Sequence, residues 1–381
     1  MDFDLSEEQS IALGAFRRFV ETEIAPAVEP WRDATIPKDL AHTLLRKLAP
    51  YGVGTGWLGE NDGGLALDLV TSGLLYEELA RISPGLAGTA FINEGVALAI
   101  AMLGTPEQKR RWLPRLLAGE LIGCSAITEP GVGSNVRMVR TRAVRDGDGW
   151  RVRGEKTWIS NAGISDLAVV VVRGEDESEG LSQMVVERDD GYRSRELPKL
   201  GLNDWSTAEL VFDDVFVPVG RRLGEPGVGL RTTLRLFERA RCFVAAIATG
   251  IARAALDASL VYVQSREQWG KKIGGHQLVQ ELIADMATEL DAARLLMLRG
   301  LHLVQKGIRC DTQTSMAKYY ATEAAVRIAS RAIEVHGAYG LSRELPVELH
   351  FRNARMMTIP DGTSEIQKLI IGRNLIGLAA F

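Results

Sequence analysis

The chain has 381 residues, of which 46% are apolar and 25% are charged, and its formal net charge is −4. This is more chain than one hydrophobic core usually holds, so we expect two or three domains in an enzyme of ordinary globular composition. Charges of both signs are mixed along the chain without a basic stripe, which argues against nucleic acid as a partner.

The sequence also argues against a membrane protein, a disulfide-bonded protein and a metal-binding protein. The acidic N-terminus is unlike a signal or transit peptide, and apolar runs such as 96–103 are too short to span a bilayer. The five histidines show no ligand spacing, and the cysteines are odd in number and far apart, so we expect reduced thiols and a cytoplasmic protein. The cysteines are Cys124, Cys242 and Cys310.

The first third of the chain predicts helices. Ser6 and Gln9 have the spacing of a capping box, and Thr105, Pro106 and Gln108 form a second helix start. Apolar residues recur at helical spacing after each of these signals. Besides the helix that begins at Ser6, the expected helices run over 38–48, 67–81, 88–103 and from 105 to about 119.

The periodicity changes near residue 121 and again near 229. Short β-rich segments, separated by turns such as 146–149, fill the middle of the chain. Long helices then return, and 230–264 lacks proline, as in a helix buried in a bundle or a subunit interface. We therefore predict an α+β multidomain fold: an N-terminal helical domain (1–120), a middle β domain (121–228) and a C-terminal four-helix-bundle domain (229–381).

Two stretches of the middle segment suit a flat, polar-edged ligand. In 124–136, an extended run breaks at Pro130 into a glycine-containing loop, with Thr128 before the break and Ser134 after it. In 154–161, Trp158 offers a flat apolar face and Ser160 a hydroxyl. Each stretch alone is more simply a surface turn, but a strand that ends in such a loop can hold a ring and hydrogen-bond to its edge.

Taken together, these stretches resemble the flavin-binding segments of the acyl-CoA dehydrogenase family, T-E-P-x-x-G-S-D and K-x-W-I-T/S-N. The resemblance covers essentially the whole chain, because that family shares the α, β, α order. It implies FAD as the cofactor, and the chain has no G-x-G-x-x-G motif of a Rossmann site. The implied flavin contacts in this part are Ile127, Thr128, Ser134, Trp158 and Ser160.

Two later motifs extend the implied FAD site. Residues 266–277 resemble R-x-x-F-G-x-x-I-x-x-x-Q, with Trp269 in place of phenylalanine. In relatives this segment reaches the FAD of a neighbouring subunit, and an arginine and an aromatic ring suit a nucleotide and its pyrophosphate. Residues 334–340 resemble Q-x-x-G-G-x-G, with Glu334 for glutamine and Ala338 for the second glycine. The implied contacts are Arg266, Trp269, Gln277, Glu334 and Gly337, in a homotetramer or dimer.

A fifth motif concerns the catalytic base. Residues 352–367 resemble R-D-A…Y-E-G-T-x-x-I-Q, whose glutamate is the base in most relatives, and here Asp361 holds that position. A carboxylate is required because flavin cannot remove an α proton. Aspartate is one methylene shorter, and a displacement of roughly 1 Å costs ~10²-fold unless it is compensated, for instance by Pro360. The alternative is that Asp361 only caps the helix starting near Thr363. Thr363 and Glu365 are further implied FAD contacts.

The substrate side is less well defined. Some relatives carry their base on the long helix after the β domain, where the matching position is Ala240. Residues 200–207 lack the arginine of the family's G-x-R-x-S-x-T, and Trp205 within them lines the substrate cavity or belongs to the core. The residues implied to lie near the substrate are Ser134, Glu238, Arg241 and Gly362.

The resemblance implies an FAD-dependent α,β-dehydrogenase of an acyl-CoA thioester, which passes its electrons to an electron-transfer flavoprotein. One alternative substrate is an acyl or aminoacyl thioester on a carrier protein of a biosynthetic pathway. A related flavin oxidase or monooxygenase, and a partner subunit that has lost catalysis, are the remaining alternatives.

Overall fold

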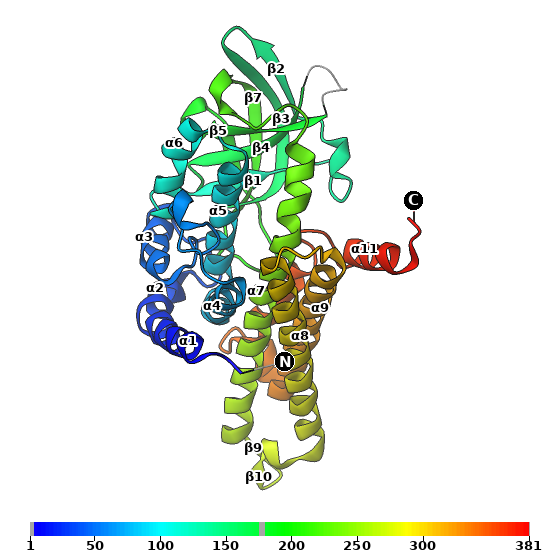
Figure 1. Cartoon of the computed structure of the whole chain (residues 1–381). Coiled ribbons are helices and arrows are strands. Elements are labelled where there is room, and N and C mark those ends of the chain that lie inside the picture. The colour runs from blue at the N-terminus through cyan, green and yellow to red at the C-terminus, as the bar shows by residue number, and fades with distance from the viewer. Residues whose placement is uncertain (1–3, 175–179, 381) are drawn as a thin grey trace.

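The structure is a computed structural model that describes residues 4–174 and 180–380, and it shows the helical, β and helical parts expected from the sequence (Figure 1). The N-terminal helices are α1 (Glu7–Phe19), α2 (Ala25–Val28), α3 (Lys38–Leu48), α4 (Leu69–Ile82), α5 (Pro84–Leu103) and α6 (Pro106–Leu117). Both predicted capping boxes are present, Ser6 with Gln9 and Thr105 with Gln108. They satisfy the free backbone N–H groups at the starts of α1 and α6.

The middle of the chain folds into an eight-stranded sheet. Its main path is β6-β7-β3-β2-β4-β5-β8, and β1 pairs in parallel with β4. The strands are β1 (Gly123–Ala126), β2 (Arg142–Asp146), β3 (Gly149–Ser160), β4 (Leu167–Arg173), β5 (Leu181–Glu187), β6 (Arg193–Glu196), β7 (Thr207–Pro218) and β8 (Arg222–Leu223). β4 is buried along nearly its whole length, which explains its uninterrupted apolar sequence.

The C-terminal part is built around α7 (Gly229–Ser265), a helix of 37 residues that runs down most of the molecule (Figure 1). The other elements are β9 (Glu267–Gln268), β10 (Lys271–Lys272), α8 (Gln277–Gln305), α9 (Asp311–His336), α10 (Val347–Met357) and α11 (Ser364–Ile376). Buried alanines on α7 and α9, such as Ala248 and Ala325, let the two helix backbones approach closely.

Two helices are longer and more apolar than the short apolar runs of the sequence indicated. Pro84–Leu103 and Arg231–Ser265 are each long and apolar enough to cross a membrane by length and composition. In each, 72% of the most apolar window is buried inside the protein, which is the pattern of a core helix. Short polar interruptions within these helices hid their length in the sequence.

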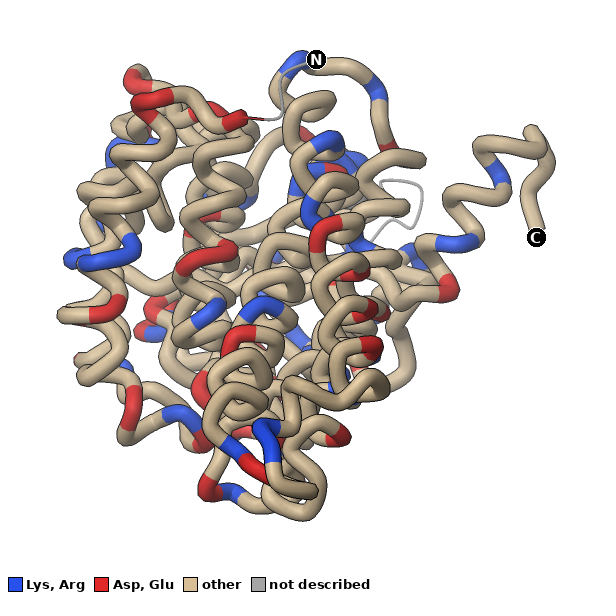
Figure 2. Tube along the Cα trace, turned by 90° about the horizontal axis from the view of Figure 1, so that it is seen from below, with Lys and Arg blue, Asp and Glu red and all other residues tan. Residues whose placement is uncertain are grey.

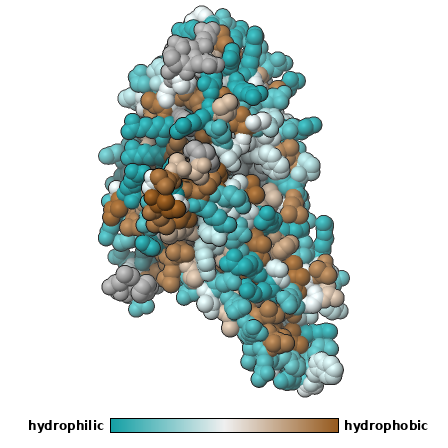
Figure 3. All heavy atoms as spheres, turned by 90° about the vertical axis from the view of Figure 1, so that its right-hand side faces the viewer, coloured by the Kyte–Doolittle hydropathy of each residue, from teal (hydrophilic) through white to brown (hydrophobic). Residues whose placement is uncertain are grey.

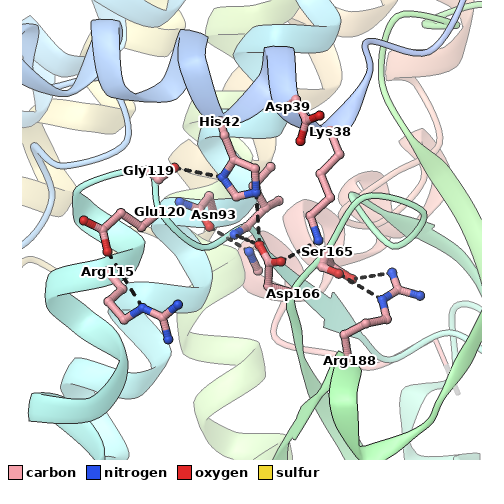
Figure 4. Close-up of polar contacts among 12 residues, drawn as sticks. Lys38, Asp39, His42, Asn93, Arg115, Gly119, Glu120, Ser165, Asp166 and Arg188 are labelled. Carbon is pink, nitrogen blue, oxygen red and sulfur yellow. Dashed lines mark hydrogen bonds and ion pairs between the residues drawn. The ribbon is translucent and has the colours of Figure 1, made fainter.

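The N-terminal helices and the sheet are joined by a polar cluster around Asp166 (Figure 4). The Asp166 carboxylate accepts a hydrogen bond from the Ile122 backbone N–H at 2.8 Å and pairs with Lys38 Nζ at 2.5 Å. His42 of α3 places Nε2 3.3 Å from this carboxylate and Nδ1 2.8 Å from the carbonyl oxygen of Gly119. Both ring nitrogens therefore face acceptors, and the hydrogen bond to Asp166 raises the pKa of His42.

The surface charges are interleaved, and one helix stands apart from the body. Figure 2 shows basic and acidic segments alternating along the trace, and α11 projecting to one side. α11 and the residues after it expose Leu375, Ile376 and Leu378 by about 70% each. Figure 3 faces this side and shows apolar side chains gathered there. An exposed apolar group of this kind suits a protein–protein contact.

Candidate functional site

The predicted flavin loop leaves the end of β1 as a tight turn. The backbone of Glu129 exchanges hydrogen bonds of 3.0 Å with Val132 in both directions, and the Thr157 N–H donates to the Thr128 carbonyl oxygen at 2.9 Å. The loop is thereby attached to β3, the strand that carries Trp158. The two stretches that sequence analysis paired are neighbours in the fold.

A buried ion pair fixes this attachment. Lys156 Nζ donates to Glu129 Oε1 and to the Ile127 carbonyl oxygen, each at 2.9 Å. Glu129 also accepts hydrogen bonds from the backbone N–H groups of Arg140 and Thr141. Burial lowers the pKa of Lys156 to about 8; burial would raise the pKa of Glu129, but its hydrogen bonds lower it. Sequence analysis did not identify Lys156 as a site residue.

Trp158 presents its indole to the outside of the sheet. It lies at a register shift between β3 and β7 with φ +58°, and 54% of the residue is exposed. An L-residue with positive φ is uncommon, and a tryptophan this exposed on a sheet is unusual. Ser160 is half-buried two residues on, and Ser134 is exposed beyond the loop. A flat apolar face bordered by hydroxyls fits a ring system with polar edges, as the flavin of FAD is.

Asp361 occupies a strained turn between α10 and α11. Asp361 has φ +54° and Gly362 has φ +92°, so two consecutive residues adopt the left-handed region. The cap of α11 is Thr363, whose side chain accepts a hydrogen bond from the Ile366 N–H. The interpretation of Asp361 as the helix cap is therefore wrong, and its carboxylate is free of that role.

Lys318 of α9 and Gln367 of α11 hold this turn in place. Lys318 is fully buried and donates to the carbonyl oxygens of Thr358 and Gly362, each at 2.9 Å. Gln367 Nε2 donates to the carbonyl oxygens of Asp361 and Gly362 at 3.1 and 2.9 Å. A lysine buried without exposure is rare, and sequence analysis missed it because it continues an ordinary helical pattern.

The charges around Asp361 set its proton affinity. Burial raises the pKa of Asp361, and the charges of Lys318 and Arg241 oppose that rise without cancelling it. Burial also lowers the pKa of Lys318 to about 8. The outcome is a carboxylate that is more basic than an ordinary aspartate, in a fixed position.

Arg241 and Glu238 lie on α7 next to this turn but have different partners. Arg241 is 8% exposed, and its Nε has no hydrogen-bond acceptor among the residues that the structure describes. Glu238 Oε1 accepts a hydrogen bond from the Cys310 N–H at 3.0 Å, which ties α7 to the start of α9. Of the substrate residues implied by the resemblance, Arg241 and Gly362 are close to Asp361, whereas Glu238 is engaged with backbone. Glu365, an implied FAD contact, is exposed on the first turn of α11.

The other implied FAD contacts lie at the opposite end of α7. Arg241 and Arg266 are twenty-five residues apart, about 37 Å along a helix that rises 1.5 Å per residue. Trp269 is 93% exposed, and Arg266 lines a surface cavity of about 370 Å³ together with Tyr339. Gln277 begins α8, and Glu334 and Gly337 lie at the exposed end of α9. Within one chain, these residues therefore lie far from the Asp361 turn.

Trp205, for which sequence analysis left two interpretations, belongs to the core. It is 5% exposed, and its Nε1 donates to Asn161 Oδ1 at 2.9 Å. Asn161 in turn donates to the carbonyl oxygens of Thr89 and Gly123. Elsewhere in the described part of the chain, all three cysteines are free and buried, and no group of side chains is suited to a metal ion.

Comparison with protein families matches three domain models along the chain. They are the N-terminal domain of acyl-CoA dehydrogenase over residues 6–120, its middle domain over 124–215 and its C-terminal domain over 227–376. The matched segments correspond to the N-terminal helices, the sheet and the C-terminal helices.

Individual relatives cover the chain from end to end. A probable acyl-CoA dehydrogenase of Bacillus subtilis, YngJ, is 34% identical over 99% of this chain and 100% of its own length. A glutaryl-CoA dehydrogenase of Mycobacterium smegmatis, solved in complex with FADH2, is 34% identical with a TM-score of 0.91, over 99% of this chain and 96% of that one. The prolyl acyl carrier protein oxidase AnaB is 28% identical with a TM-score of 0.91, over 98% of this chain and 100% of that one.

Proposed function

Because the chain belongs to the acyl-CoA dehydrogenase family, whose members are FAD-dependent oxidoreductases acting on CH–CH bonds, we propose that it introduces an α,β double bond into an acyl thioester. In this reaction the α carbon loses a proton, the β carbon loses a hydride, and the two electron pairs form the new double bond and reduce the acceptor. When bound, FAD supplies the acceptor of the hydride.

Asp361 takes the α proton in this proposal. Its support is that the carboxylate caps no helix, has a raised pKa and sits in a turn whose backbone is fixed on both sides. A base of raised pKa matches the weakly acidic α proton of a thioester better than an ordinary aspartate does. The long helix α7 offers only Ala240 at the rival position, so no second carboxylate competes there.

The left-handed backbone at Asp361 is the feature that compensates for the shorter side chain in this proposal. A positive φ redirects the Cα–Cβ bond compared with an ordinary turn, and the resulting strain persists because Lys318 and Gln367 hold the following carbonyl groups. The backbone, and not the side chain, thereby carries the carboxylate toward the substrate. Arg241 and Lys318 keep it ionised by their charge.

FAD would be held by two chains. The loop after β1 supplies hydroxyls, and Trp158 supplies a flat surface for the flavin ring. In the same chain, Arg266 and Trp269 lie beyond the far end of α7, about 37 Å along the helix from Arg241. This separation supports a homo-oligomer in which the lower group of one chain, Arg266, Trp269, Gln277, Glu334 and Gly337, completes the FAD site of another. We propose a homotetramer or dimer on this basis.

The reduced enzyme would be reoxidised by an electron-transfer flavoprotein. This partner distinguishes a dehydrogenase from an oxidase or monooxygenase, which reacts with oxygen itself. Mixing the reduced protein with air-saturated buffer tests the choice. We expect slow reoxidation; rapid reoxidation with an oxygenated product would instead indicate the oxidase or monooxygenase.

The test of the proposed function is an anaerobic titration. The purified protein is mixed with saturated acyl-CoA thioesters of increasing length and with branched and dicarboxylic ones, and the visible flavin absorbance is followed. We expect one class of thioester to bleach the bound flavin. A protein that cannot be loaded with FAD, or a flavin that no thioester reduces, would contradict the proposal.

A thioester on a carrier protein is the second candidate substrate. It is favoured by the similarity to the prolyl acyl carrier protein oxidase AnaB and by residues 200–207, which lack the arginine of the family pattern. One acyl group presented on CoA and on a phosphopantetheinyl carrier protein separates the candidates. Bleaching by the carrier-bound group alone would select the second.

A further inference from the structure

One side of α7 connects exposed arginines at the start of the helix with the buried arginine beside the proposed base. Arg231, Leu234 and Arg235 are exposed, Glu238 is half-buried, and Arg241 is 8% exposed. Their spacing of i, i+3, i+4, i+7 and i+10 places all five on the same side of a helix with 3.6 residues per turn. Because an α-helix rises 1.5 Å per residue, Arg231 and Arg241 are about 15 Å apart along this side.

The buried end of this side lies at the Asp361 turn. Arg241 is close enough to Asp361 for its charge to act on that carboxylate. The loop between α8 and α9 meets α7 at the same level, because Glu238 accepts the hydrogen bond of the Cys310 N–H. The exposed arginines lie beyond this level, on the part of α7 that stands next to the sheet (Figure 1). They therefore share one side of the helix with the groups that face the base.

The exposed arginines of α7 lack counter-ions. Neither Arg231 nor Arg235 forms an ion pair with any residue that the structure describes, whereas Arg153 and Arg195 on the sheet pair with carboxylates of a neighbouring strand. Arg231 also lies in the first turn of α7, where the helix dipole disfavours a cation. A negatively charged partner would compensate both arginines, and in a chain of net charge −4 such a basic surface stands out.

Exposed apolar side chains lie among these charges. Leu234 is 45% exposed and follows the two arginines along α7, and Ile308 is 50% exposed in the loop that meets α7. The next residue, Arg309, has a side chain that is 84% exposed, and it pairs with Asp311 at 3.3 Å. Nucleotide phosphates are typically bound by backbone N–H groups that converge on one point, whereas apolar side chains bordered by charged ones are typical of a surface that meets another protein.

We propose that this surface docks a carrier protein whose acidic side chains surround the arm that bears the thioester. The docking surface consists of Arg231, Leu234, Arg235, Ile308 and Arg309. This inference rests on the proposed function and selects the carrier-protein thioester from its two candidate substrates. Complementary charges would steer the carrier protein and fix its orientation. Its phosphopantetheinyl arm would then follow the side of α7 over about 15 Å to the Asp361 turn.

The test compares one acyl group on two carriers. The group is loaded onto CoA and onto an acidic acyl carrier protein in its phosphopantetheinyl form, and kcat/KM is measured for each thioester. We expect the wild type to favour the carrier-protein thioester. In the double variant Arg231→Glu, Arg235→Glu the ratio of the two kcat/KM values should fall by about 10- to 100-fold, because like charges across an interface are strongly disfavoured. Arg46→Glu, at an exposed position on α3, is the matched control and should keep the wild-type ratio.

A change on the carrier protein tests the same contact without altering the enzyme. When the acidic residues next to the arm are replaced by their amides, kcat/KM of the wild-type enzyme for the carrier-protein thioester should fall. Raised ionic strength should also lower it, because salt screens exposed charges. A carrier protein that loses its acids without any loss of kcat/KM would overturn the proposal, even if the double variant of the enzyme fails to fold.

The remaining outcomes separate the alternatives. A wild type that favours the CoA thioester, or a double variant with an unchanged ratio, would overturn the proposal. An equal loss on both thioesters would overturn it as well, and would show that the arginines bind the arm that the two substrates share. Sedimentation of the double variant as a smaller oligomer than the wild type would assign the surface to a second copy of the chain. If neither thioester is oxidised, the proposed function itself fails.

Discussion

At the scale of single residues, the site depends on how the surroundings of Asp361 tune one carboxylate. Burial raises its pKa, and the opposing charges keep the ionised form available. The kcat/KM profile of the free enzyme reports such a base as an acidic limb. We expect that limb to lie above the ordinary aspartate value of about 4.

Lys318→Met removes one of the two opposing charges. The pKa of Asp361 should then rise further, which moves the acidic limb of kcat/KM to higher pH by roughly one unit or more. The matched control is Lys368→Met, an exposed lysine on α11. A uniform loss of activity at every pH, with the limb unmoved, would show that Lys318 acts only through the fold.

At the scale of elements, the buried pair Glu129 and Lys156 joins the flavin loop to β3. Lys156→Met leaves the Glu129 charge without its cation, and we expect a loss of about 3 kcal/mol in unfolding free energy. The double variant with Glu129→Gln should lose less than the two single variants together. Urea denaturation of all four proteins measures this coupling, and strict additivity would show that the pair is not coupled.

His42 links α3 to the start of the sheet in a pH-dependent way. Its pKa is raised in the folded state, so its contribution to stability is complete below the unfolded value of about 6.5 and is lost as pH rises through the folded value. The difference in urea midpoint between wild type and His42→Gln should therefore be larger at pH 6 than at pH 9. His302→Gln, exposed on α8, serves as the control, and a pH-independent difference would contradict this account.

Local signals were sufficient to predict most elements, but not the long-range contacts. The caps at Ser6 and Thr105 and the apolar periodicity indicated the helices, because these patterns act within one or two turns. The fixation of Asp361 by Lys318 could not be predicted, since the two are 43 positions apart and a lysine in a helix is usually exposed. The unpaired N–H groups of Trp57 and Arg239, which have no acceptor among the described residues, likewise could not be predicted, because their burial depends on how distant segments pack together.

At the scale of the whole molecule, the two ends of α7 should act in different subunits. A chain with Arg266→Ala and Trp269→Ala keeps Asp361, and a chain with Asp361→Asn keeps the lower group. We expect each to be inactive alone and mixed oligomers, formed by joint refolding, to regain part of the activity. A mixture no more active than its components would contradict a site shared between chains.

The most direct test of the central claim is the anaerobic reaction of Asp361→Asn in a stopped-flow spectrometer, with the thioester that bleaches the wild type. Asparagine nearly preserves the shape of the side chain and removes its basicity, so the variant should bind FAD and thioester normally. We expect the rate of flavin bleaching to fall by about 10³-fold or more, since a general base alone contributes ~10²–10⁴. Bleaching at a rate close to that of the wild type would show that another group removes the α proton.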